Sequence, residues 1–176
     1  MLSKQLAFHF DQKYCIGCKT CQTACKDKNN LEPGQFYRKV SEFEEGSYVK
    51  IGSGVTPQID VHFLSISCNH CLEPACVKAC PTGAMEKLEE DGIVRIEQDK
   101  CIGCRKCERS CPYNAPQYLP QNRKVGKCDF CLDLLKKDQA PACVSACPMR
   151  VLDYGPLTEL RGKTYVFAST NHDLRN

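Results

Sequence analysis

The chain has 176 residues, of which 16 are cysteine, and it carries a formal net charge of +3. Cysteine at about 9 % would indicate a disulfide scaffold in a short secreted chain. However, residues 1–11 lack both an unbroken apolar stretch and a signal-peptide cleavage site, so disulfides are the weaker interpretation. No apolar run approaches the ~18 residues that cross a bilayer, so we expect no direct membrane insertion and a chain that is cytoplasmic by its own sequence.

The first predicted element is a short strand over Leu6–Phe10, where β-forming residues alternate in part with others. A first quartet of cysteines follows with the spacing C-x2-C-x2-C-x3-C: Cys15, Cys18, Cys21 and Cys25. Residues 31–60, rich in Gly, Glu and aromatic residues, then separate this quartet from the next. A solvated surface loop is the default interpretation of this segment, and docking of a partner is the alternative.

A second strand is predicted over Val61–Ile66, directly before the second quartet. This quartet has the spacing C-x2-C-x4-C-x3-C-P: Cys68, Cys71, Cys76 and Cys80. Residues 83–88, a turn at 90–92 and β-forming residues up to Ile96 then predict a hairpin.

The third quartet repeats the first spacing and is followed by Pro112: Cys101, Cys104, Cys107 and Cys111. Residues 120–126 are predicted to form a loop. The fourth quartet has the spacing C-x2-C-x11-C-x3-C-P: Cys128, Cys131, Cys143 and Cys147. No cysteine is left over.

The four quartets form an internal repeat in which two kinds of unit alternate. The first and third share Cys-Ile-Gly-Cys, whereas the second and fourth share Pro-Ala-Cys-Val-x-Ala-Cys-Pro. This self-similarity indicates duplication of a small metal-binding unit. Gly17 and Gly103 suit a tight loop in which a side chain would crowd the metal centre or forbid a positive φ.

The run C-x2-C-x2-C-x3-C-P is the bacterial ferredoxin signature, in which three thiolates hold one cuboidal cluster and the fourth cysteine reaches a neighbouring cluster. Structural zinc also uses C-x2-C pairs, but it does not need a third cysteine two residues further on. The sequence therefore predicts four 4Fe-4S clusters, with all sixteen cysteines as ligands and no catalytic residue.

These clusters would change the charge of the molecule, because each oxidised cluster with four thiolates contributes about −2. The holoprotein would carry roughly −5, so the basic balance disappears and we expect no nucleic-acid partner. Six cations sit beside cysteines, where they either offset cluster charge or are ordinary solvated side chains: Lys19, Lys26, Arg105, Lys106, Arg109 and Lys127.

Sequence separations predict which quartets share clusters. Cys80 and Cys101 are separated by 20 residues, whereas Cys25 and Cys68 are separated by 42. The second and third quartets should therefore pair, and the first and fourth should pair around them. The four predicted ligand sets are Cys15, Cys18, Cys21 with Cys147; Cys128, Cys131, Cys143 with Cys25; Cys68, Cys71, Cys76 with Cys111; and Cys101, Cys104, Cys107 with Cys80.

The predicted fold class is α+β, with two ferredoxin-like two-cluster modules made of short strands, short helices and long loops. The outer module comprises residues 1–60 and 116–150, the inner module residues 61–115, and residues 151–176 form a C-terminal tail. The apolar core must be small, so we expect the clusters to hold the fold together.

Other candidate residues are better explained by packing. His70 lies between two cysteines and could form a hydrogen bond to a ligand, although packing or simple exposure is the favoured interpretation. Tyr14, Tyr113 and Phe130 are expected to shield clusters from water. If every cysteine is a ligand, every iron is saturated, so we expect an electron carrier and not an enzyme.

Several segments resemble the electron-transfer B subunit of the dimethyl sulfoxide reductase (molybdopterin oxidoreductase) family. They are the four-quartet order, Leu-Ser-Ile-Ser-Cys-Asn-His-Cys at 64–71, Cys-Pro-Thr-Gly-Ala at 80–84, Cys-Pro-Tyr-Asn-Ala-Pro-Gln at 111–117 and Cys-Pro-Met-Arg-Val-Leu-Asp-Tyr-Gly-Pro at 147–156. The resemblance covers essentially the whole chain. Sibling subunits of polysulfide, thiosulfate and arsenate reductases, formate dehydrogenases and catechol dehydroxylases are similar.

The resemblance implies a large catalytic partner with a molybdenum or tungsten bis-pterin site, and in many members a membrane anchor subunit that exchanges electrons with quinol. It implies that the first-quartet cluster lies nearest the pterin. It also implies membrane association or export only together with a partner. Some relatives replace the second cysteine of the third quartet by Trp and hold a 3Fe-4S centre; here Cys104 is present and the chain has no Trp.

Three other functions remain open at this stage, one of which is a structural zinc module that scaffolds other proteins. A freestanding polyferredoxin would shuttle electrons among several enzymes and be stable without a partner. The iron–sulfur subunit of a formate dehydrogenase or hydrogenase complex would differ in its partner alone.

Overall fold

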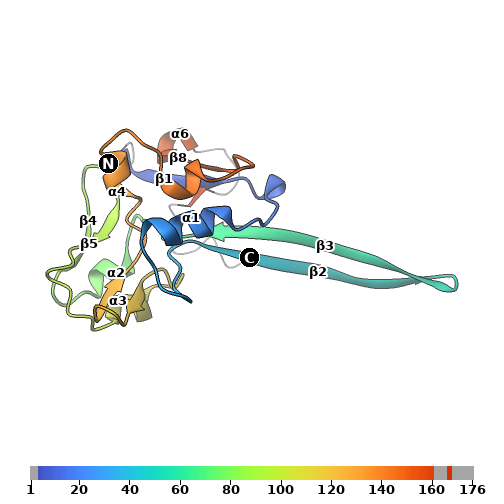
Figure 1. Cartoon of the computed structure of the whole chain (residues 1–176), viewed down its shortest axis with the longest axis horizontal. Coiled ribbons are helices and arrows are strands. Elements are labelled where there is room, and N and C mark those ends of the chain that lie inside the picture. The colour runs from blue at the N-terminus through green and yellow to red at the C-terminus, as the bar shows by residue number, and fades with distance from the viewer. Residues whose placement is uncertain (1–3, 161–165, 168–176) are drawn as a thin grey trace.

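The computed structural model describes residues 4–160 and 166–167, and its elements are short except for one long hairpin (Figure 1). Four separate sheets are present in this part of the chain: one has the strand order β8-β1-β9 and the other three are two-stranded hairpins. Within these residues no helix is long and apolar enough to cross a membrane.

The central sheet joins the two ends of the described chain. Strand β1 (Leu6–Phe10) runs antiparallel to β8 (Leu152–Pro156), with Leu6 opposite Pro156 and Phe10 opposite Leu152. The short strand β9 (Val166–Phe167) pairs with the other edge of β1. Helix α6 (Leu157–Leu160) continues directly from β8. This pairing brings the segment that precedes the first quartet against the segment that follows the fourth.

The hairpin of β2 (Lys39–Ile51) and β3 (Gly54–Ile66) extends far from the rest of the molecule (Figure 1). Its 13 cross-strand pairs run from Lys39 opposite Ile66 to Ile51 opposite Gly54. Gly52 has a φ of 62°, which suits the first position of a two-residue hairpin turn. We call this hairpin, residues 39–66, the arm.

The remaining elements lie outside the β8-β1-β9 sheet and the arm. They are the 3₁₀ helix η2 (Gln12–Tyr14), α1 (Thr20–Lys28), α2 (Ala75–Lys78), β4 (Met85–Lys87), β5 (Val94–Ile96), α3 (Lys106–Ser110), β6 (Gln117–Leu119), β7 (Lys124–Gly126), α4 (Leu132–Leu135) and α5 (Ala142–Ser145). Strands β4 and β5 pair between the second and third quartets, and β6 and β7 pair between the third and fourth.

The helices that carry cysteines pack in two couples. Helix α1 packs against α5, and α2 packs against α3. The larger core contains Phe8, Phe10 and Phe130 together with cysteines of the first, second and fourth quartets, and a smaller core contains Met85 and Val94 with cysteines of the second and third. Sulfur thus makes up a large part of what is buried.

The mixture of short strands and helices confirms the α+β class. The predicted strand over Leu6–Phe10 coincides with β1, and the hairpin predicted near 83–96 is the β4–β5 pair. The prediction of a loop over residues 31–60 is wrong for most of that segment, because its residues from Lys39 onward form the arm. The predicted loop at 120–126 contains the turn between β6 and β7 and also β7 itself.

Candidate metal centres

The sixteen cysteines all lie within the described residues, where none of them forms a disulfide. The first and third quartets share their loop geometry. Gly17 and Gly103 have φ values of 65° and 68°, and Lys19 and Arg105 both have a φ of 60° before their helices. The duplicated Cys-Ile-Gly-Cys sequence therefore forms the same turn twice.

One pocket contains cysteines from both the first and the fourth quartet. Cys15, Cys18 and Cys21 line it, and so does Cys147 from the end of the chain, together with Phe10 and Leu152. Burial raises the pKa of Cys15, and the thiolate of Cys147 raises it further. The β1–β8 pairing brings Cys147 to the first quartet across most of the chain length.

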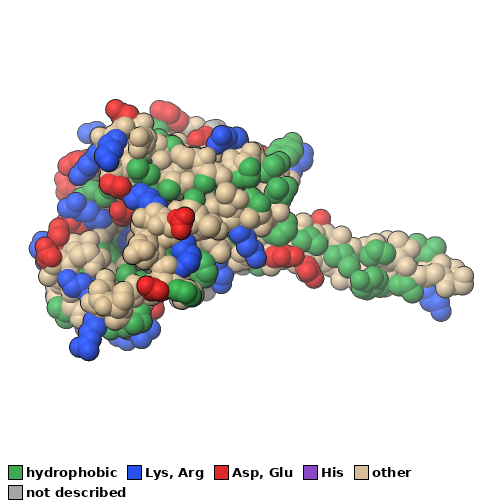
Figure 2. Space-filling model, in the orientation of Figure 1, with side chains coloured by type: hydrophobic (Ala, Val, Ile, Leu, Met, Phe, Trp, Pro, Cys, Tyr) green, Lys and Arg blue, Asp and Glu red, His purple; other side chains and the backbone are tan. Residues whose placement is uncertain are grey.

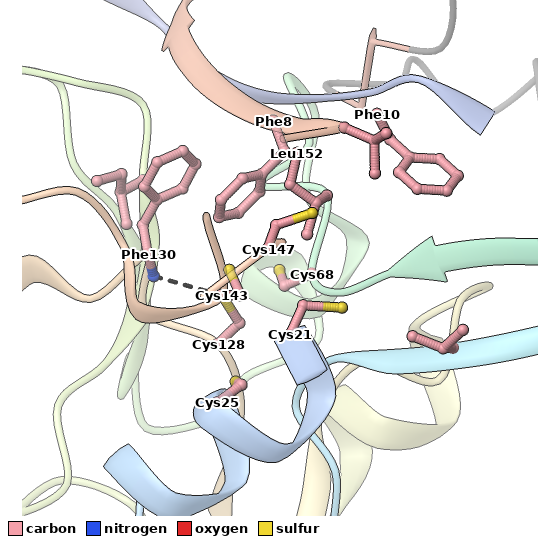
Figure 3. Packing of buried hydrophobic residues seen from close by; sticks show 13 residues of the cluster. Phe8, Phe10, Cys21, Cys25, Cys68, Cys128, Phe130, Cys143, Cys147 and Leu152 are labelled. Carbon is pink, nitrogen blue, oxygen red and sulfur yellow. Dashed lines mark hydrogen bonds between the residues drawn. The ribbon is translucent and has the colours of Figure 1, made fainter. Parts of the chain in front are cut away.

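The remaining cysteine of the first quartet lies with the fourth. Burial raises the pKa of Cys25 to about 12, and the neighbouring thiolates of Cys143 and Cys131 raise it as well. Burial also raises the pKa of Cys128 well above its ordinary value, and among its charged neighbours the thiolate of Cys25 has the largest effect. In Figure 3 the side chains of Cys25, Cys128 and Cys143 lie on one side of the cysteine group, and those of Cys21 and Cys147 lie on the other.

Cysteines of the second and third quartets are neighbours in the same way. Burial raises the pKa of Cys71 to about 11 and that of Cys76 to about 12, and Cys68 and Cys111 are charged neighbours of both. In the third quartet, burial raises the pKa of Cys107 to about 11, and its charged neighbours are Cys80, Cys101 and Cys104. Each neighbourhood joins three cysteines of one quartet to one of another.

These buried thiols suit a metal cluster. Burial disfavours the charged thiolate, whereas a bound metal replaces the thiol proton and stabilises the thiolate with its positive charge. No group of three or more described His, Cys, Asp or Glu side chains could hold a single metal ion. Each cysteine of a 4Fe-4S cluster binds a different iron, so the four sulfurs need not converge on one ion. The spread sulfurs and the all-thiolate donor set fit such a cluster.

Hydrogen-bond donors approach several of the sulfurs. The Thr20 hydroxyl donates to Cys18 Sγ at 3.4 Å and lowers the pKa of that thiol. The backbone N–H of Met85 lies 3.4 Å from Cys80 Sγ, and that of Phe130 lies 3.4 Å from Cys128 Sγ (Figure 3). Such donors stabilise negative charge on a cluster and thereby raise its reduction potential.

Arg38, which no sequence motif marks, is a buried cation close to the cysteines. Its side chain is 1 % exposed. Its Nη1 donates to the Ser65 carbonyl at 3.2 Å and to Ser65 Oγ at 3.1 Å, and Nη2 donates to Ser67 Oγ at 3.0 Å. The Ser65 hydroxyl in turn lies 3.4 Å from Cys21 Sγ.

The charges around Arg38 come from cysteines. Burial lowers its pKa, but the thiolates outweigh burial and hold the pKa above its ordinary value; they belong to Cys143, Cys128, Cys21 and Cys25. The backbone N–H of Arg38 also forms a hydrogen bond to Cys25. A buried cation is costly unless negative charge compensates it. Arg38 therefore lies where cysteines of the first and fourth quartets meet.

Among the cations noted beside cysteines, Lys127 is buried, with 5 % of its surface exposed. Its Nζ donates to the carbonyls of Val94 and Cys128, and its charge lowers the pKa of Cys128 and of Cys76, against the larger effect of burial. Lys19, Arg105 and Lys106 are exposed. Lys127 thus has the environment expected of a cation that offsets cluster charge.

Of the two environments that the sequence favoured for His70, packing and exposure, the structure shows packing. His70 is 1 % exposed, its Nδ1 accepts the N–H of Val94 at 3.0 Å, and its ring meets the ring of Phe130 edge-on with centroids 5.2 Å apart. Burial lowers its pKa well below the ordinary value. Phe130 is buried too, but Tyr14 is 56 % exposed and does not shield the interior from water.

The fold and the cysteine geometry define a ferredoxin-like iron–sulfur protein. A 4Fe-4S dicluster domain matches residues 59–157, and a 4Fe-4S binding domain matches residues 12–29. The chain belongs to the family of the iron–sulfur B subunits of anaerobic dimethyl sulfoxide reductase. It is 45 % identical over 162 residues to the B subunit of the anaerobic dimethyl sulfoxide reductase of Escherichia coli, covering 92 % of this chain and 78 % of the relative.

Other relatives extend the range of this family. The B subunit of the Haemophilus influenzae anaerobic dimethyl sulfoxide reductase is 47 % identical over 161 residues, covering 91 % of this chain and 78 % of the relative. The thiosulfate reductase electron transfer subunit of Salmonella typhi is 38 % identical over 159 residues, covering 90 % and 79 %. The relatives are electron-transfer or B subunits of multi-subunit reductase-type complexes.

Proposed function

We propose that the chain carries four 4Fe-4S clusters and relays electrons to or from the molybdenum or tungsten bis-pterin site of a large catalytic partner subunit. The observation that carries this proposal is the pocket in which Cys147 joins Cys15, Cys18 and Cys21. Exchange of one cysteine between paired quartets is how two-cluster ferredoxins hold their clusters.

The proposed ligand sets follow from the neighbourhoods of the thiols. The first cluster is held by Cys15, Cys18, Cys21 and Cys147, and the second by Cys128, Cys131, Cys143 and Cys25. The third is held by Cys68, Cys71, Cys76 and Cys111, and the fourth by Cys101, Cys104, Cys107 and Cys80. The electrostatic interactions between these cysteines support all four sets.

These sets imply two modules. The outer module comprises residues 1–60 and 116–150, the inner module residues 61–115, and residues 151–176 are the tail whose strand β8 pairs with β1. The packing of α1 on α5 and of α2 on α3 supports this division. The helices α2 and α3 lie at the end of the molecule remote from the arm (Figure 1), so the clusters would form a path from one end to the other.

The bound clusters supply one-electron transfer, and the protein supplies ligation, burial and nearby charge. With four thiolates on each cluster, every iron is saturated and no coordination position is left for a substrate. The chain would therefore carry electrons without transforming a molecule itself.

The partner is inferred from the family. The relatives are subunits of reductase complexes, so we infer a large catalytic subunit that holds the pterin site, with a membrane anchor subunit as a further partner. The location of the chain then follows that of the complex.

Elemental analysis tests this function. The chain is purified anaerobically from its native source with whatever accompanies it, and iron, molybdenum, tungsten and zinc are counted per complex. About sixteen iron atoms per chain and one molybdenum or tungsten atom in a large partner are expected. Sixteen iron atoms without a partner would favour a freestanding polyferredoxin, and zinc without iron would overturn electron transfer altogether.

A further inference from the structure

The arm is the longest element of the described chain, and its residues 39–58 lie outside the matched domains, which cover residues 12–29 and 59–157. Strands of 13 residues span about 40 Å at roughly 3.3 Å per residue. An isolated two-stranded hairpin is marginally stable in water. We therefore expect another surface to cover an arm of this length.

One face of the arm is apolar along β3. Because side chains alternate between the two faces of a strand, a set of residues spaced by two shares one face: Val55, Pro57, Ile59, Val61 and Phe63. We call these five residues the β3 stripe. The residues between them face the other way and are polar: Thr56, Gln58, Asp60 and His62.

The outer part of the stripe is open to solvent. Val55 is 64 % exposed, Ile59 44 % and Val61 45 %. Tyr48 on β2 lies opposite Pro57 and is 69 % exposed, so it adds an aromatic side chain to the same face. Figure 2 shows hydrophobic side chains along much of the arm. Contiguous exposed apolar surface of this kind marks an interaction site.

The root of the stripe lies against the first cysteine quartet. A Cβ placed on Gly17 would lie 2.4 Å from the Phe63 ring, so the stripe begins in direct contact with the Cys15–Cys18 loop. A groove at the same place is lined by Gln12, Lys13 and Cys15 on one side and by Asp60, Val61 and His62 on the other. Cys18, in the Cys15–Cys18 loop, is exposed. A surface that covers the stripe therefore also meets the first-quartet loop.

We propose that the β3 stripe and the first-quartet loop (Cys15–Cys18) form one docking surface for the catalytic partner subunit. The arm would hold that subunit against the first cluster. This inference rests on the proposed function. The partner would offer a groove at least as long as the arm, apolar at its floor. Glu42 and Glu44 are exposed and lie opposite Phe63 and Val61, so that groove would be basic where it meets the root of the arm.

Two other occupants fit less well. A second copy of this protein on the stripe would cover the exposed Cys18 and close this end of the electron path to a partner. A membrane surface rich in anionic lipid would be repelled by the carboxylates at the root of the arm.

Matched substitutions on the two faces test the proposal. Ile59→Asp places a charge in the stripe, whereas Gln58→Asp places the same charge on the next residue, which faces the other way. Each variant complex is purified anaerobically, iron is counted per chain, and the affinity of the variant for the catalytic subunit is measured. We expect Ile59→Asp to weaken binding at least about tenfold. Gln58→Asp should bind like the wild type, and iron per chain should be unchanged in both.

Equal binding by both variants, each fully loaded with iron, would overturn the docking surface while leaving the proposed function intact. The wild-type protein could instead form dimers that Ile59→Asp dissociates, with no change in binding to the catalytic subunit. That result would assign the stripe to a second copy and would also overturn the docking surface. Absence of any pterin-containing partner from the wild-type preparation would instead overturn the proposed function on which the docking surface rests.

Discussion

Replacement of Arg38 by Gln removes a buried charge at the meeting point of the first and fourth quartets while it keeps a polar side chain, shorter than arginine, that can donate hydrogen bonds. Arg38 Nη1 lies 3.1 Å from Ser65 Oγ, which lies 3.4 Å from Cys21 Sγ, so Nη1 is no more than about 6.5 Å from that sulfur. The charged neighbours that raise the pKa of Arg38 most are thiolates.

The size of the effect follows from Coulomb's law. At an effective dielectric constant of about 20, a unit charge about 6.5 Å from an added electron stabilises that electron by roughly 2.5 kcal/mol. For a one-electron couple about 59 mV corresponds to a tenfold change in the equilibrium constant, or roughly 1.4 kcal/mol. We therefore expect Arg38→Gln to lower the reduction potential of the cluster bound by Cys21 by about 100 mV.

The assay is an anaerobic redox titration of the purified complex followed by electron paramagnetic resonance, with iron counted in parallel. Arg38→Lys is the matched control, because it keeps the charge while it loses the planar fork that contacts two serines. It should shift the potential by much less than Arg38→Gln. An Arg38→Gln complex with full iron content and unshifted cluster potentials would refute the electrostatic role of Arg38.

Three further results are expected. Cys147→Ser should alter the resonance signal of the cluster bound by the first quartet, whereas Cys25→Ser should alter that of the fourth; a change in the opposite signals would contradict the exchanged ligand sets. Gly103→Ala should destabilise the protein by more than the roughly 1–2 kcal/mol cost of a positive φ, because its Cβ would lie 2.1 Å from the Arg123 carbonyl oxygen. Gly83→Ala shares the positive φ but meets nothing within 4 Å, so it should cost only that strain in denaturant unfolding and is the control. Removal of iron by a chelator should abolish most protection of backbone amides from hydrogen exchange, since so much of the core is cysteine. Full protection in the iron-free protein would show that the apolar residues are enough to hold the fold without clusters.

The cysteine pattern was readable from the sequence because ferredoxin loops are local. Three ligands within seven residues and a helix that carries the fourth need no long-range contact, so spacing alone predicts the motif. The strand over Leu6–Phe10 was readable for the same reason. The pairing of this strand with β8 could not be predicted, because no local sequence pattern links Phe10 to Leu152.

The predicted strand over Val61–Ile66 is the end of β3, but the rest of the arm and Arg38 were missed, for two different reasons. The alternation from Val55 to Phe63 is a strand signal, but Gly, Glu and Pro in the same segment favour a loop, and two strands extended into solvent run against the usual dependence of sheets on a covered face. Arg38 belongs to no motif, since a single arginine in a polar segment is ordinarily solvated. Only the fold, which places Ser65 and Ser67 around it, makes it a buried cation.

The pairing of β1 with β8 also constrains the order in which the molecule can be built. Cys15 and Cys147 line one pocket although they are separated by most of the chain, whereas Cys80 and Cys111 belong to quartets that follow each other closely. During synthesis the second and third quartets leave the ribosome well before Cys147 does. With the proposed ligand sets, the inner cysteines could therefore accept iron while the polypeptide is still growing, and the first-quartet centre would be completed only after Cys147 has been made and β8 has paired with β1.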